Sequence, residues 1–172
     1  MQDGKVLGYV ANQLGFSEIG RIMLYHLLPG IKTAGIEPIE PFELGRPHYP
    51  EKELNDAQSH EERRKLLTEF NSKVAVMNKK SMKDSDIMLP ILDGGHVVDD
   101  GTACEIGHYA AHKYGPIIAL RTDFRLSENE AACVNPQIES DIKESGGMIC
   151  TSLEKWYNGM GNAAKRIRAG RS

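Results

Sequence analysis

Short apolar segments alternate with longer amphipathic segments along the whole chain. Apolar side chains that recur every three or four residues, such as Ile19, Ile22, Met23 and Leu27, are typical of a helix that buries one face. This spacing predicts helices over 17–34, 59–83, 102–114, 137–145 and 152–168. The short apolar runs predict strands over 5–11, 36–41, 86–92, 116–121 and 148–150.

The regular alternation of strands and helices predicts an α/β protein. Strand 86–92 reads DIMLPIL, and an almost entirely apolar strand is typical of a parallel sheet covered on both faces. We therefore expect a doubly wound, five-stranded parallel sheet in a three-layer α/β/α arrangement. A length of 172 residues fits a single domain spanning 1–172. Segment 43–58 is rich in Pro, Gly and polar residues and predicts a long surface loop.

Composition excludes several classes of function. With 21 basic and 24 acidic side chains, the chain lacks the positive charge that a broad nucleic-acid interface needs. No apolar run approaches the roughly 20 residues that span a bilayer, so we expect no membrane contact. The first residues lack the layout of a signal peptide. The chain has 3 cysteines and no C-x-x-C pair, which favours reduced thiols in a cytoplasmic protein.

Acidic residues gather where strand 86–92 is followed by helix 102–114. Ligands of parallel sheets bind beyond the carboxyl ends of the strands, so this junction is a candidate site. Glu105 falls in the first turn of the predicted helix, where the helix dipole favours an ionised carboxylate. An ionised carboxylate in a cleft is a candidate nucleophile, and a neighbouring carboxylic acid is a candidate proton donor. Retaining glycosyl transfer uses this pairing.

A purely structural interpretation competes with the chemical one. Thr102 and Glu105 have the spacing of a capping box, in which both side chains bind free N–H groups at the start of a helix. Asp93-Gly94 and Asp99-Asp100-Gly101 also have the composition of turns. The local pattern alone leaves both interpretations open.

Six motifs follow one another along the chain: YVAxxLGFSE from Tyr9, DIML from Asp86, LDG around Asp93, DxGTxxEIG from Asp99, RTDFR ending at Arg125, and VN ending at Asn135. Together, over about residues 6–156, they resemble the nucleoside 2-deoxyribosyltransferase family. The resemblance implies a flavodoxin-like fold and exchange of a purine or pyrimidine base on 2-deoxyribose, as in nucleotide salvage. It implies no metal or organic cofactor, with small nucleosides and nucleobases as ligands.

The resemblance also implies roles for individual residues. Glu105 attacks C1′ and expels the base, and a second base captures the covalent deoxyribosyl-glutamate intermediate. Asp86 handles protons on the base, and Tyr9 orients the nucleophile by a hydrogen bond. Asp99 holds the nucleoside. Asn135 reaches the sugar 5′-hydroxyl in a neighbouring subunit's site, so the resemblance implies a homo-oligomer with shared active sites.

Four further residues complete the expected substrate-binding set. Gly101 belongs to the D-x-G-T motif, and Phe16 either stacks on a nucleobase or packs in the core. Asp93 binds substrate or only shapes its turn. Arg125 pairs with Asp123 or meets a sugar or phosphate oxygen.

Some features depart from the family pattern or favour other functions. Asp100 stands where the resemblance implies serine, and its charge is expected to raise the pKa of Glu105. His108 and His112 have metal-ligand spacing, but the sequence offers no third ligand, so we expect no metal site. The main alternative function is an N-glycosidase that hydrolyses 2-deoxynucleosides or their 5′-monophosphates with the same glutamate. A flavodoxin-like receiver is disfavoured because Asn12 and Gln13, not acids, follow the first strand.

Overall fold

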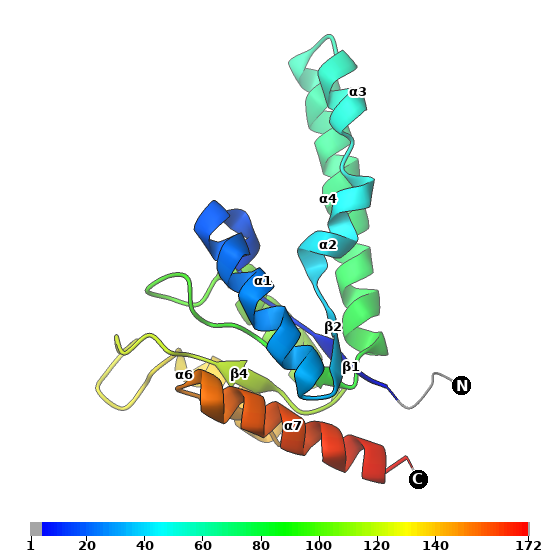
Figure 1. Cartoon of the computed structure of the whole chain (residues 1–172). Coiled ribbons are helices and arrows are strands. Elements are labelled where there is room, and N and C mark those ends of the chain that lie inside the picture. The colour runs from blue at the N-terminus through cyan, green and yellow to red at the C-terminus, as the bar shows by residue number, and fades with distance from the viewer. Residues whose placement is uncertain (1–4, 172) are drawn as a thin grey trace.

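A computed structural model describes residues 5–171 (Figure 1). Its elements follow in the order β1 (Val6–Tyr9), α1 (Glu18–Thr33), β2 (Ile36–Ile39), α2 (Pro41–Gly45), α3 (Glu51–Asp56), α4 (His60–Asp84), β3 (Ile87–Met88), α5 (Asp100–Ala111), β4 (Ile118–Leu120), α6 (Pro136–Glu144), β5 (Met148–Cys150) and α7 (Leu153–Ala169). Short 3₁₀ turns lie at Leu14–Phe16 and Arg46–His48. The predicted alternation of strands and helices is confirmed.

The strands are all parallel, but they form two sheets. One has three strands in the order β2-β1-β3, and the other pairs β4 with β5. Isolated parallel bridges, including Ile91 with Leu120, join β4 to the segment around β3. Pro90 has no N–H to donate to a sheet ladder, which explains why β3 is short. We expected one continuous sheet of five strands, and the structure instead has a three-stranded sheet and a two-stranded sheet.

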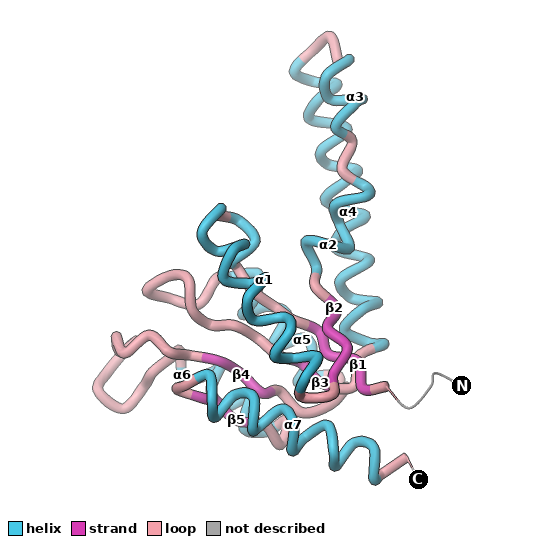
Figure 2. The backbone as a smooth tube through the Cα atoms, in the orientation of Figure 1, coloured by secondary structure: helices cyan, strands magenta, loops and turns pink. Residues whose placement is uncertain are grey.

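Helices cover both faces of the strands (Figure 2). On one face α1 and α7 bury apolar side chains against alternate strand residues, among them Leu27, Ile31, Trp156 and Met160. On the other face α4, α5 and α6 do the same with Met82, Ile106, Tyr109 and Ile142. No helix within residues 5–171 combines the length and the apolar character that a membrane crossing needs.

Residues 41–84, which contain α2, α3 and α4 and which we call the arm, project from this layered body. In Figure 1 α3 lies beside the first half of α4, far from the strands. Leu54 of α3 is buried, and Arg63 of α4 donates to its carbonyl oxygen. The prediction of a long loop over 43–58 is therefore wrong. Proline begins α2 at Pro41 and precedes α3 at Pro50, and both positions suit helix starts.

Candidate active site

A cavity of about 840 Å³ lies beyond the carboxyl ends of β1 and β2, between the arm and the start of α5. Its walls include Asn12 after β1, Phe42 of α2, Asn78 of α4 and Glu105 of α5. This volume is within the range of small-molecule sites, roughly 300–1,000 Å³. The position agrees with the rule that parallel sheets bind ligands at this edge.

Glu105 is held through one of its two carboxylate oxygens. The Tyr9 hydroxyl donates to Glu105 Oε1 at 2.7 Å, and Asn78 Nδ2 donates to the same atom at 3.2 Å. Glu105 Oε2 has no hydrogen-bond partner among residues 5–171. The expected contact between Tyr9 and Glu105 is therefore present, and one oxygen stays available to a ligand.

Burial dominates the electrostatics of this group. Burial raises the pKa of Glu105, and the hydrogen bonds from Tyr9 and then Asn78 act against that rise. The negative charge of Asp99 raises the pKa of Glu105 further, whereas Asp100, the expected cause, is exposed and accepts a bond from the Gly101 N–H. Burial also raises the pKa of Tyr9 far above its ordinary value, so its hydroxyl remains a donor.

Helix α5 begins earlier than the sequence predicts. Asp99 is its N-cap residue, and Asp99 Oδ2 accepts from the Thr102 N–H at 2.9 Å and from the Thr102 hydroxyl at 3.2 Å. Glu105 therefore lies in the second turn, not the first. The alternative of a capping box between Thr102 and Glu105 is wrong, because the Glu105 side chain bonds to Tyr9 and Asn78 instead.

Asp86 does not join this group. It directly precedes β3, at the amino end of the strand, whereas the cavity lies beyond the carboxyl ends. Its Oδ2 accepts from the Leu7 N–H at 2.7 Å, and its Oδ1 is paired with Arg171. Asp86 is not among the residues that line the cavity. The structure therefore gives it a role in joining strands and not a place beside Glu105.

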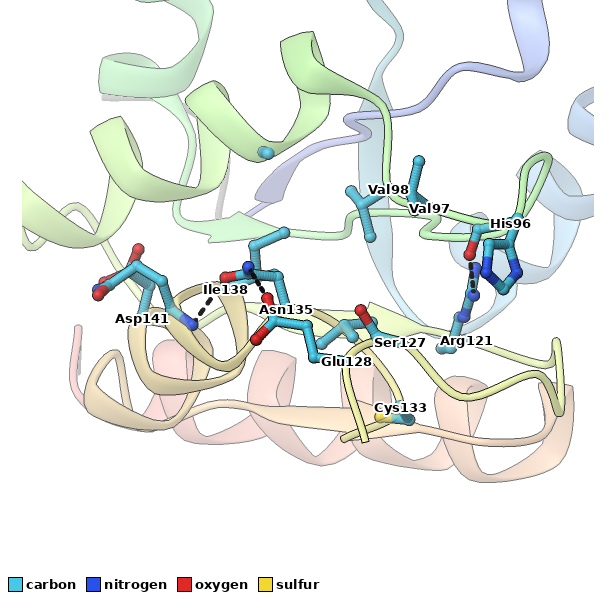
Figure 3. Close-up of a pocket in the computed structure, with 13 residues that line it drawn as sticks. His96, Val97, Val98, Arg121, Ser127, Glu128, Cys133, Asn135, Ile138 and Asp141 are labelled. Atoms are coloured by element: carbon cyan, nitrogen blue, oxygen red, sulfur yellow. Dashed lines mark hydrogen bonds between the residues drawn. The ribbon is translucent and has the colours of Figure 1, made fainter. Parts of the chain in front are cut away.

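Asn135 also lies away from Glu105 within one chain. It caps α6, where its Oδ1 accepts from the Gln137 N–H at 2.9 Å, and its Nδ2 donates to Glu128. Figure 3 shows Asn135 in a second cavity, of about 550 Å³, whose other side includes His96 and the buried Arg121. Its role toward a neighbouring subunit stays a prediction.

Asp93 and Arg125 connect loops at the carboxyl ends of the strands. Asp93 accepts hydrogen bonds from the Thr122 N–H, the Thr122 hydroxyl and the Asp123 N–H, all between 2.7 and 3.0 Å. Arg125 is paired with Asp123, and this contact holds the pKa of Asp123 well below its usual range. Neither Asp93 nor Arg125 lines the cavity, so the structure matches their structural interpretations.

Phe16, Asp99 and Gly101 do line the cavity with Glu105. The Phe16 side chain is 75% exposed, and its ring meets Phe42 edge to face with centroids 4.9 Å apart. Phe16 is thus an exposed aromatic wall and not a core residue, which keeps it available for contact with a flat ligand.

The arm supplies the part of the site that the sequence does not predict. Asn78, Phe42, Tyr49 and Phe70 all line the cavity, and the Tyr49 and Phe70 rings meet edge to face at 5.3 Å. The α4 residues concerned, 70, 71, 74, 75 and 78, recur at helical spacing on one face. That spacing is visible in the sequence, but nothing local shows what the face contacts.

The described residues offer few side chains that could bind a metal ion together. Among the described residues, no group of three or more His, Cys, Asp or Glu side chains is placed to hold a metal ion. The His108 and His112 rings lie side by side, tilted by 42°, with centroids 4.2 Å apart. The cavity is lined by carboxylates, amides, a phenol, a hydroxyl and aromatic rings, and also by the guanidinium groups of Arg21 and Arg46.

These features define an α/β protein with a partly buried carboxylate, fixed by a tyrosine, at the ligand-binding edge of a parallel sheet. The family model described as Nucleoside 2-deoxyribosyltransferase matches residues 9–160, and the chain belongs to that family. The family acts on small nucleosides and nucleobases. A search of curated proteins finds no match.

Two solved structures share the fold. A conserved protein from Enterococcus faecalis V583 is 21% identical, with a TM-score of 0.65 over 92% of this chain and 98% of that one. A 2-deoxyribosyltransferase from Bacillus psychrosaccharolyticus is 16% identical, with a TM-score of 0.57 over 89% of this chain and 91% of that one. At these identities the likeness concerns the fold.

Proposed function

We propose that this chain exchanges purine and pyrimidine bases on 2-deoxyribose through a covalent deoxyribosyl-Glu105 intermediate. The observation that carries the proposal is the Glu105 carboxylate, which faces a ligand-sized cavity with Oε1 fixed and Oε2 unbonded. Membership of the deoxyribosyltransferase family supports the class of reaction.

The reaction then proceeds in two displacements at C1′. Glu105 Oε2 forms a bond to C1′, the glycosidic C–N bond breaks, and its electron pair leaves with the base. The carboxylate stabilises the positive charge that develops on the sugar. In the second step a nitrogen of the incoming base forms a bond to C1′, the bond between C1′ and Glu105 breaks and frees the carboxylate, and the proton of that nitrogen passes to the group that protonated the departing base. No electron acceptor or metal is required for either step to balance.

Proton transfer to the departing base needs a second group. General acid catalysis of this kind contributes typically about 10²–10⁴-fold. Because Asp86 lies outside the cavity, we assign this role to Asp99, which lines it. For this role Asp99 must carry a proton when the base departs, and in the second step it takes up the proton that the incoming base loses. Asp99 Oδ2 is committed to the start of α5, so its Oδ1 is the oxygen left for the nucleoside.

The position of Asn135 supports the expected oligomer. Asn135 is exposed and lies in a different cavity from Glu105, so within one chain it does not complete the site. A role at the sugar 5′-hydroxyl therefore requires a second copy, and we propose a homo-oligomer with shared active sites. Size-exclusion chromatography with light scattering tests it, and a monomer that exchanges bases at full rate overturns it.

The central experiment separates transfer from hydrolysis. Purified protein is incubated with deoxyadenosine, with and without free cytosine. Formation of deoxycytidine supports base exchange, whereas release of adenine alone, with or without cytosine, supports the N-glycosidase. A parallel reaction with deoxyadenosine 5′-monophosphate tests the phosphorylated substrate. The exposed Arg21 favours a phosphorylated substrate, because it lines the cavity and has no ion-pair partner among residues 5–171.

Intact mass spectrometry after a rapid quench tests the covalent step. The wild type should carry a deoxyribosyl adduct that Glu105→Ala lacks, and Glu105→Ala should lose base exchange. Full activity in Glu105→Ala, with no adduct on the wild type, rules out the mechanism.

A further inference from the structure

Asn78 is the side chain of the arm that touches the proposed nucleophile. Its Nδ2 donates to Glu105 Oε1, the same oxygen that the Tyr9 hydroxyl contacts. A carboxylate accepts and does not donate, so this contact fixes which end of the amide faces Glu105. The other end, Asn78 Oδ1, is buried and has no hydrogen-bond partner within the described part of the chain.

We propose that Asn78 is a positioning residue with two contacts, one to Glu105 and one to a hydroxyl group of the substrate's sugar. The proposal rests on the proposed function. Through Nδ2 it helps to hold Oε1, so that Oε2 is the oxygen that attacks C1′. Through Oδ1 it accepts a hydrogen bond from the sugar once the side chains that cover this atom move apart as substrate enters the cavity that Asn78 lines.

Distances favour the sugar over the base as the partner of Oδ1. The two polar atoms of the Asn78 amide share one carbon, and Nδ2 is 3.2 Å from Glu105 Oε1. In a reactive complex C1′ lies about 3–3.5 Å from the attacking oxygen. In a displacement the departing base lies on the face of C1′ opposite to the attacking oxygen, so a donor bound to Oδ1 on the Glu105 side belongs to a hydroxyl of the sugar. Because a buried acceptor without a partner is unfavourable, a sugar hydroxyl is a favourable ligand there.

A positioning role also makes a prediction about pH. The groups that act on Glu105 are Tyr9 from β1, Asn78 from α4 and Asp99 from the start of α5. The Asn78 bond lowers the pKa of Glu105, so its removal raises that pKa. Attack needs the carboxylate, and the acid limb of the pH–rate profile therefore moves to higher pH.

The test compares Asn78→Ala and the isosteric Asn78→Asp with Asn162→Ala, an exposed asparagine of α7. Loss of a hydrogen bond to a charged group should lower kcat/KM for base exchange by about 10- to 100-fold in Asn78→Ala. Asn78→Asp places a second carboxylate beside Glu105 and should lower it at least as far. Asn162→Ala should match the wild type. Thermal unfolding confirms that each variant is folded.

Sugar analogues test the second contact. The substrates are deoxyadenosine, 2′,3′-dideoxyadenosine and 2′,5′-dideoxyadenosine. For the wild type, removal of the hydroxyl that binds Oδ1 should lower kcat/KM by about 10-fold. Asn78→Ala should no longer distinguish that analogue from deoxyadenosine. A loss with 2′,3′-dideoxyadenosine identifies the 3′-hydroxyl as the partner of Oδ1, and a loss with 2′,5′-dideoxyadenosine identifies the 5′-hydroxyl.

Two results overturn the inference. One is an Asn78→Ala variant whose acid limb coincides with that of the wild type. The other is that each analogue lowers kcat/KM, relative to deoxyadenosine, by the same factor in Asn78→Ala as in the wild type. In both cases the proposed function survives if Glu105→Ala is inactive and the wild type forms the adduct. Without an adduct, and with an active Glu105→Ala, the proposed function itself fails.

Discussion

Replacement of Glu105 by glutamine should abolish base exchange and, at neutral pH, stabilise the protein. Burial raises the pKa of Glu105 above the ordinary 4.5, which means that the folded state disfavours its charge. Stability from a group of this kind is fully present below its unfolded pKa and is lost as the pH rises through its folded pKa. Glutamine keeps the shape of the side chain without the charge.

The size of the effect follows from two opposed contributions. Tyr9 and Asn78 each bind the carboxylate more strongly than a neutral amide, by about 1 kcal/mol for each bond. Burial of an unpaired carboxylate costs several kcal/mol, and the direction of the pKa shift shows that this cost prevails. The expected gain for Glu105→Gln at neutral pH is therefore about 1–2 kcal/mol, within the range of stabilising single substitutions. For a chain of this length it raises Tm by about 2–8 °C.

Thermal and urea unfolding of the wild type and Glu105→Gln between acidic and neutral pH measures this gain. Glu69→Gln, at an exposed position of α4, is the matched control and should change Tm little at any pH. The gain in Glu105→Gln should shrink as the pH falls toward 4.5, because the wild-type side chain then becomes neutral as well. A less stable Glu105→Gln at neutral pH, or a gain that does not depend on pH, refutes the reasoning.

Three further substitutions test single contacts. Tyr9→Phe removes a hydrogen bond that lowers the pKa of Glu105, so a pH–rate profile should show the acid limb at higher pH, with kcat/KM lower by about 10- to 100-fold. Gly15→Ala would place a methyl group 2.2 Å from the Phe42 ring and should reduce stability to urea by about 1–3 kcal/mol. Trp156→Phe removes a ring N–H that donates to a β4 carbonyl at 2.8 Å, and calorimetry should show a loss of about 1–3 kcal/mol. An unchanged pH profile or unchanged unfolding in any of these variants contradicts the contact concerned.

The sequence predicted the longer helices well, because amphipathic spacing and end signals agree in them. The expected segments 59–83 and 137–145 correspond to α4 (His60–Asp84) and α6 (Pro136–Glu144), whose ends are marked by capping side chains. The short helices of 43–58 could not be predicted from local sequence, because helices this short are stable only through packing: Leu54 of α3 is buried, and its carbonyl oxygen accepts from Arg63 of α4. The start of α5 was misplaced because Asp99, and not Thr102, caps it.

The site residues that belong to sequence motifs could be predicted. Tyr9 ends a strand and Glu105 follows the acidic loop, and the structure joins them by a hydrogen bond. Asn78 was not predictable, because its contact depends on how α4 lies against α5. The placement of Asp86 beside the base conflicts with an elementary rule: a residue that precedes a parallel strand lies at the opposite edge from the ligand.

The arm gives the protein a modular construction. Residues 41–84 leave the sheet after β2 and return before β3, and they bring most of the aromatic lining of the cavity with them. The nucleophile and the helix that carries it belong to a separate stretch of chain. The arm of a relative, transferred as one piece with Asn78 retained, is therefore the natural unit of redesign for a new base preference.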